Sequence, residues 1–148
     1  MLFRSVGAHV HSRSEEFFYV LDGAVDLLAF EPIVRTGDNW QAWRSADGER
    51  VLRGGPGAMM HVPAGCPHAF ANPGPEPVRL LFQSAPPPDH ERYFEELVEL
   101  LAAPPERRTE AIAALRERHD IRQLTPLIPG GPLPDAANHP SALSLDAE

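Results

Sequence analysis

The chain has 148 residues, of which 43% are hydrophobic and 23% charged, which suits one domain with a hydrophobic core and excludes two ordinary ones. A net charge of −8 disfavours nucleic acids and anionic membrane surfaces as partners, because both attract cationic proteins. All 13 basic residues are arginines, so Schiff-base catalysis by a lysine is excluded.

The N-terminal residues and the single cysteine bear on the compartment. Residues 1–5 lack the cationic start and apolar stretch of a secretory signal, and no apolar run approaches the roughly 18 residues that span a bilayer. Cys66 alone cannot form an intrachain disulfide and fits a reducing compartment. We therefore expect a cytoplasmic protein without membrane contact.

Residues 1–85 predict an all-β unit of short strands. Turn-forming pairs such as Asp22-Gly23, Asp47-Gly48 and Pro73-Gly74 separate apolar runs. The strands predicted from these runs cover residues 16–21, 24–30, 49–52, 58–62, 68–71 and 78–83. Many short strands at regular spacing are typical of a β-sandwich or barrel.

The remainder of the chain predicts two helices and a tail. Three prolines at 86–88 end the sheet, and apolar residues at helical spacing predict helices over 89–101 and 106–118. The rest, rich in proline, glycine and alanine, is predicted to be disordered. This divides the chain into a barrel (1–85), a helical extension packed on it (86–125) and a tail (126–148).

The first group of residues that could carry a function is His9-Val10-His11, followed by Glu16 and then Gly23. Side chains two positions apart in a strand lie on the same face, so the two imidazoles would stand side by side. A carboxylate a few residues later would complete a ligand set with open positions for substrate or dioxygen. This spacing alone also occurs in proteins that bind no metal.

A second group lies in the string GAMMHVPAGCPHAFAN, which contains Gly57, Pro63, Gly65, His68 and Asn72. Gly57 and the Pro63 to Gly65 segment are expected to make tight turns that carry the chain between sheets. Together, the two groups resemble the paired motifs of the cupin superfamily. The match covers the whole second motif and every position of the first motif after its opening glycine, where this chain has Phe3.

The resemblance implies a double-stranded β-helix, the all-β cupin jelly-roll barrel, with a C-terminal pair of helices. It further implies that one divalent metal ion is held inside the barrel by His9, His11, Glu16 and His68. Fe²⁺ is favoured, and Mn²⁺, Ni²⁺, Co²⁺ and Zn²⁺ are alternatives, because such a site accepts several first-row ions.

The segments 93–97 (YFEEL) and 118–121 (RHDI), with Pro126 beyond them, resemble the C-terminal helices of small quercetin-dioxygenase-like bacterial cupins. The resemblance thus favours a dioxygenase that acts on a small organic molecule, with Glu16 also accepting a substrate proton. A non-oxidative metal-dependent cupin, such as a polyketide cyclase or isomerase, and a non-catalytic small-molecule-binding cupin are the alternatives.

Two features leave alternatives open. Glu15 competes with Glu16 as the ligand, and we prefer Glu16 because only it leaves six residues before Gly23. The chain also begins only eight residues before His9, whereas cupins have strands upstream. Either the start is misassigned or a neighbouring subunit supplies the missing strands, and since an open sheet edge favours association, we expect a homodimer.

Other side chains are weaker candidates. For the pocket wall we expect Phe18, Val20, Met60 and Phe70, with His61 as a cavity-lining proton-transfer group or a structural histidine. Trp40 and Trp43 would either cover an apolar substrate or, as we prefer, pack in the core of an added hairpin turned at Asp47-Gly48. Cys66 is expected to be buried filler. His90, His119 and His139 are expected to be solvated, and the helices to cover a sheet face without a catalytic role.

Overall fold

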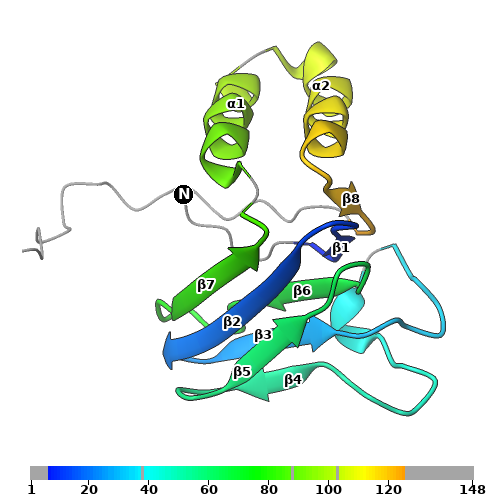
Figure 1. Cartoon of the computed structure of the whole chain (residues 1–148), viewed down its shortest axis with the longest axis vertical. Helices are drawn as coiled ribbons and strands as arrows, with labels where there is room; N and C mark the ends of the chain where they lie inside the picture. The colour runs from blue at the N-terminus through cyan, green and yellow to red at the C-terminus, as the bar shows by residue number, and fades with distance from the viewer. Residues whose placement is uncertain (1–6, 38, 88, 103, 126–148) are drawn as a thin grey trace, which may run out of the picture.

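The computed structural model describes residues 7–37, 39–87, 89–102 and 104–125. Its described part contains two β-sheets followed by a helical hairpin (Figure 1). The elements are β1 (His9–Val10), β2 (Glu15–Asp22), β3 (Val25–Ala29), the 3-10 helix η1 (Trp40–Ala42), β4 (Leu52–Gly54), β5 (Met59–Val62), β6 (His68–Ala71), β7 (Arg79–Ala85), α1 (His90–Ala102), α2 (Pro105–Arg118) and β8 (Arg122–Gln123).

The two sheets have strand orders β4-β3-β6-β1-β8 and β5-β2-β7, and every pairing within them is antiparallel. Their arrangement confirms the predicted double-stranded β-helix with a C-terminal pair of helices. Side chains on β2 alternate as predicted: Glu16, Phe18 and Val20 are buried, whereas Phe17 and Tyr19 on the opposite face are half-buried. The inward face packs against β3 and β5, and this apolar cluster holds the sheets together.

The chain passes between the sheets at glycine-containing turns. Gly57 precedes β5 and Gly65 precedes β6, so each turn joins a strand of one sheet to a strand of the other. Both glycines have positive φ values, +91° and +82°, which side chains with a Cβ rarely adopt. The prediction that these turns change sheets is therefore confirmed.

A second apolar cluster contains both tryptophans. Trp40 and Trp43 are 2% and 3% exposed, and the indole of Trp43 donates a hydrogen bond to Thr36 Oγ1 over 2.9 Å. They precede a hairpin in which Gly48 N donates to Ser45 O. The preferred interpretation of the tryptophans as core residues is confirmed.

One strand lies later than predicted. The expected strand at 49–52 is observed as β4 (Leu52–Gly54), while Arg50 makes only an isolated bridge to Arg44. The ladder with β3 fixes this register, and the Arg53 guanidinium donates to Asp26 Oδ1 over 2.7 Å within it. The position of the strand is thus set by cross-strand pairing and by this contact. Its apolar pattern, on which the prediction rested, does not set it.

The helices lie within one residue of their predicted ends. Their shared core consists of Tyr93, Leu97 and Leu115, with Ile112 and Ile121 packed against it. No helix in the described ranges is long and apolar enough to span a bilayer. The predicted disordered tail, His139 and Phe3 lie outside the described residues.

The sequence predicts that the sheet ends before the prolines at 86–88, but one further strand follows the helices. The short strand β8 follows α2 and pairs with β1, with His9 opposite Gln123 and Val10 opposite Arg122 (Figure 1). The position beside β1 in the sheet is thus occupied by a later segment of the same chain. The division of the chain into barrel and helical extension and the homodimer both stay predictions.

Thr125 and the residue before it hydrogen-bond to Ala8, immediately before β1. The buried Ala8 N–H donates to Thr125 Oγ1 over 2.7 Å, and the N–H groups of Leu124 and Thr125 both donate to Ala8 O. Backbone and side chain together therefore hold residues 124 and 125 against the start of β1.

We predict that Thr125→Val lowers the free energy of unfolding by about 1–3 kcal/mol, because the buried Ala8 N–H loses its acceptor while shape is retained. Urea denaturation measures the change. Thr109→Val is the matched control, since Thr109 is exposed on α2, and should change stability by less than about 0.5 kcal/mol. Equal effects of the two substitutions would contradict this role for Thr125.

Candidate metal centre

Four side chains from three separate parts of the chain converge at one point. His9 lies on β1, His11 just after it, Glu16 on β2 and His68 on β6, and one donor atom from each lies within 4.8 Å of the others. All four are buried, with His68 fully so. The antiparallel register pairs His9 directly with His68, and their ring centroids are 4.1 Å apart. The structure thus brings together the side chains predicted as ligands.

Main-chain carbonyls fix the tautomer of each histidine. His9 Nδ1 lies 2.9 Å from Gly7 O, His11 Nδ1 lies 2.9 Å from Asp120 O, and His68 Nδ1 lies 3.0 Å from Cys66 O. Since a carbonyl oxygen can only accept a hydrogen bond, each Nδ1 must carry a proton. Each neutral ring then has its lone pair on Nε2, the atom available to a metal ion.

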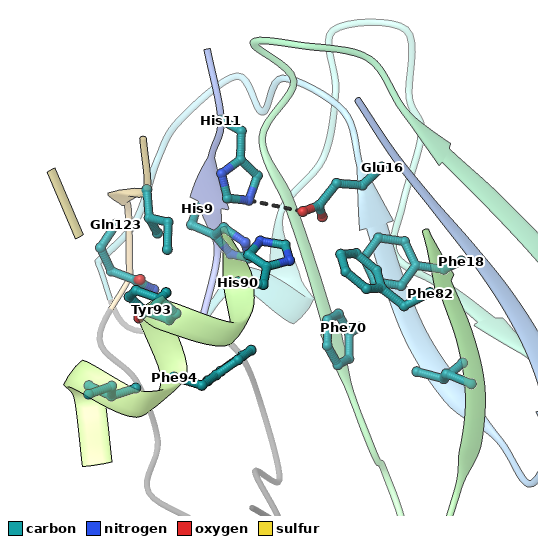
Figure 2. A pocket seen from close by; sticks show the side chains of 13 residues that line it. His9, His11, Glu16, Phe18, Phe70, Phe82, His90, Tyr93, Phe94 and Gln123 are labelled. Atoms are coloured by element: carbon teal, nitrogen blue, oxygen red, sulfur yellow. Dashed lines mark ion pairs between the residues drawn. The ribbon is translucent and has the colours of Figure 1, made fainter. Parts of the chain in front are cut away.

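Glu16 supplies the negative charge. Its Oε1 lies 3.1 Å from His11 Nε2, and its Oε2 lies 3.0 Å from His68 Nε2 (Figure 2 shows the first contact). The His68 contact lacks hydrogen-bond geometry, so the buried Nε2 atom has no hydrogen-bond partner among the described residues. A buried nitrogen beside a carboxylate but without a directed hydrogen bond fits a shared metal ion. The donor set therefore fits one divalent cation.

The ionisation states of His9 and Glu16 agree with this arrangement, whereas at His11 burial would lower the pKa but contact with Glu16 raises it. Burial, and secondarily His68 and His11, lower the pKa of His9 to about 3, so this ring is neutral at pH 7. Burial alone would raise the pKa of Glu16, but its contacts with His11 and His68 hold that pKa well below the ordinary value. The centre thus contains a neutral imidazole and an ionised carboxylate, the forms that bind metals.

The choice between the adjacent glutamates is resolved by strand alternation. Glu16 is 4% exposed and faces the histidines, whereas Glu15 is exposed and contacts His61 on the outer face over 3.1 Å. His61 itself is exposed, so the prediction that it lines the cavity is wrong. It lies between the inward-facing Met60 and Val62 on β5, and alternation directs it outward.

A pocket of about 330 Å³ opens onto this cluster (Figure 2). One wall comes from the sheets and the other from α1 with the segment after α2. Its lining residues are His9, His11, Glu16, Phe18, Phe70, Leu80, Phe82, His90, Tyr93, Phe94, Leu97, Ile121 and Gln123. Phe18 and Phe70 lie where predicted, but Met60 and Val20 pack in the inter-sheet core and do not line the pocket.

The contribution of α1 was not expected. His90 was predicted to be solvated, yet it is half-buried and lines the pocket, with its ring centroid 6.5 Å from that of His11 and 5.5 Å from that of Phe82. Burial lowers its pKa. The helix also brings Phe94 to the pocket, so it does more than cover a sheet face. His119 is not solvated either, because it packs against Tyr93.

Comparison with protein families gives the same fold. The family model described as Cupin matches residues 5–112 of the chain. The protein belongs to the cupin family. No curated protein matches the chain.

Solved structures are similar over parts of this cupin. A protein of Thermus thermophilus is 26% identical (TM-score 0.42), and the match covers 58% of this chain and 65% of that one. An oxalate decarboxylase mutant of Bacillus subtilis is 20% identical (TM-score 0.39; 54% and 18% covered). A sugar phosphate isomerase of Silicibacter pomeroyi is 24% identical (TM-score 0.38; 59% and 43% covered). The cupin spans less than two thirds of each of these chains.

Cys66 shows none of the features of a reactive thiol. It is half-buried, packs against the inter-sheet core, and its pKa is raised, chiefly by burial. A raised pKa reduces the thiolate fraction at pH 7. The expectation that it fills space is therefore supported by its surroundings.

We predict that Glu16→Gln lowers the affinity of this cupin for a divalent ion at least about tenfold, because the amide cannot supply a negative charge to the three imidazoles. Metal content after dialysis against a limiting concentration of Co²⁺ or Mn²⁺ measures the loss. Glu15→Gln, one residue away on the outer face, is the matched control and should retain one ion per chain. Equal metal content in the two variants would contradict the assignment.

Proposed function

We propose that this cupin is a mononuclear metal enzyme acting on a small, largely apolar organic molecule, and that its reaction is a quercetinase-like dioxygenation. The observation that carries the proposal is the position of the donor cluster. His9, His11 and Glu16 belong both to the cluster and to the lining of the pocket, so a molecule in the pocket would lie against the ion.

The lining supports an apolar, uncharged body for the substrate. Apart from the cluster, the described lining consists of aromatic and aliphatic side chains with His90 and Gln123, and it contains no arginine. An oxalate or a sugar phosphate is anionic and would call for cationic partners in a pocket with such an apolar lining. A planar molecule with one or two rings and a metal-binding oxygen suits these walls better.

The pocket walls would orient this molecule. Phe18, Phe70 and Phe82 form an aromatic wall, in which the Phe18 ring centroid lies 5.1 Å from that of Phe70 and 5.2 Å from that of Phe82. Phe94 stands across from them on α1 (Figure 2). A ring held between these surfaces would present its oxygen substituents to the cluster and exclude water from it.

Fe²⁺ is the ion that we propose, because it supplies both a Lewis acid for a substrate oxygen and redox chemistry for dioxygen. Within the chain, the ionised Glu16 carboxylate is the group placed to accept a proton from a substrate hydroxyl. His90 on α1 lies between His11 and Phe82, with ring centroids 6.5 Å and 5.5 Å away, and its proposed role is to contact the substrate. These roles divide ion binding, proton acceptance and substrate positioning among separate elements.

The reaction type is tested by oxygen consumption. We expect protein purified without oxygen and loaded with Fe²⁺ to consume dioxygen when a flavonol or a 1,3-diketone is added, and Glu16→Gln to abolish this consumption. An oxygen electrode and product analysis by mass spectrometry provide the measurement. Conversion without oxygen consumption by the Zn²⁺ form would instead support a cyclase or isomerase, and tight binding without conversion a binding protein.

The substrate pocket is tested separately by Phe94→Ala. Loss of about 1–2 kcal/mol of apolar contact should weaken binding of a flavonol about 5- to 30-fold, measured by fluorescence titration of the metal-loaded protein. Phe17→Ala is the control, since Phe17 lies on the outer face of β2. Unchanged binding by the Phe94 variant would exclude this pocket as the substrate site.

A further inference from the structure

The C-terminal end of α2 has an unusual residue at a critical position. The N–H of Ile121 donates to Arg116 O over 2.8 Å, and the N–H of Asp120 donates to Glu117 O over 3.2 Å. This is the hydrogen-bond pattern of a Schellman motif, whose left-handed residue is usually glycine. Here that residue is Asp120, with φ of +57°. The chain therefore places a side chain where glycine would adopt the backbone conformation more easily.

The Asp120 carboxylate binds the loop that follows His11. It accepts hydrogen bonds from Ser12 N (2.9 Å), Ser12 Oγ (2.6 Å) and Arg13 N (2.9 Å), and the Arg13 guanidinium lies 3.5 Å away. These contacts join segments more than 100 positions apart in the chain. They fix the backbone immediately after His11 relative to the end of α2.

The main-chain carbonyl of Asp120 contacts the same histidine. It accepts the Nδ1 proton of His11 over 2.9 Å. One residue thus holds His11 in two ways, through the backbone that follows it and through the ring nitrogen that does not face the cluster. A left-handed Asp120 directs its carboxylate to Ser12 and Arg13 and its carbonyl to the ring at the same time.

We propose that Asp120 is a positioning residue for the metal centre, which sets the orientation and tautomer of His11 from the C-terminal helical extension. The inference rests on the proposed metal site. It adds to the description of that site a residue that orients one ligand and lies outside both histidine-containing motifs. Asp120 lies in the segment that joins α2 to β8, and β8 lies beside β1 (Figure 1).

Asp120→Gly separates positioning from helix capping. Glycine relieves the left-handed backbone and would serve equally well or better if Asp120 only ended the helix. If Asp120 positions His11, the glycine variant should bind Co²⁺ about 10-fold more weakly, which is the effect typical of losing a group that orients a ligand. Its Co²⁺ absorption bands should also change in position or intensity, because the loop after His11 loses its contacts with the carboxylate and only the main-chain carbonyl of residue 120 still orients the ring.

The variants are compared with the wild-type chain by Co²⁺ titration followed by visible absorption, with thermal unfolding of the metal-free forms as a check on folding. Asp120→Asn, which tolerates the left-handed backbone and keeps one carbonyl oxygen, should lie between the wild type and the glycine variant. Asp47→Gly, in an exposed turn, should match the wild type. If the glycine variant does not fold, weaker Co²⁺ binding by the folded asparagine variant supports the inference.

Wild-type affinity and spectrum in Asp120→Gly would overturn the role of Asp120 while leaving the metal site intact. If only Asp120→Asn folds, wild-type affinity and spectrum in that variant would likewise overturn the role of Asp120. A wild-type protein that binds no Co²⁺ would instead overturn the metal site itself. The two failures are therefore distinguishable within one experiment.

Discussion

Three hydrogen bonds from imidazole Nδ1 atoms to main-chain carbonyls are the contacts on which the centre depends. The acceptors belong to Gly7 before β1, Cys66 in the turn before β6, and Asp120 after α2. With each Nδ1 proton held in this way, the remaining nitrogens of three buried rings face one carboxylate. Three rings and a carboxylate buried together are costly to desolvate, and a shared cation offsets that cost. Binding of a metal ion at this site would thus be coupled to the order of three distant backbone segments.

The C-terminal extension contributes to the sheet, to the pocket and to the contacts of His11. Its strand β8 occupies the sheet position beside β1, its helix α1 forms one wall of the pocket, and Asp120 contacts the ligand His11 and the loop after it. A barrel without this extension would lack the neighbour of the first ligand strand and the apolar surface opposite Phe18. In this cupin, one wall of the pocket and the hydrogen bond to the His11 ring therefore both come from segments that follow the barrel strands.

The resemblance to the paired cupin motifs led to the four candidate ligands, and local rules account for part of that set. His9 and His11 are separated by one residue, the glutamate is fixed by its spacing to Gly23, and strand alternation turns Glu16 inward and Glu15 outward. The same alternation, applied to β5 between Met60 and Val62, would have placed His61 on the outer face. By contrast, β8 has only two residues and no periodic pattern, and His90 reaches the pocket through docking of α1, which helical spacing does not encode.

The central claim is that one metal ion is held by the Nε2 atoms of His9, His11 and His68 together with Glu16. Anomalous diffraction from crystals of the full chain grown with Co²⁺ or Mn²⁺, recorded on both sides of the metal absorption edge, tests it directly. The account predicts one strong anomalous peak per chain among these four side chains, with all three Nδ1 atoms still directed at their carbonyls. A peak at another site, such as the exposed pair of Glu15 and His61, with none inside the cluster, would contradict it.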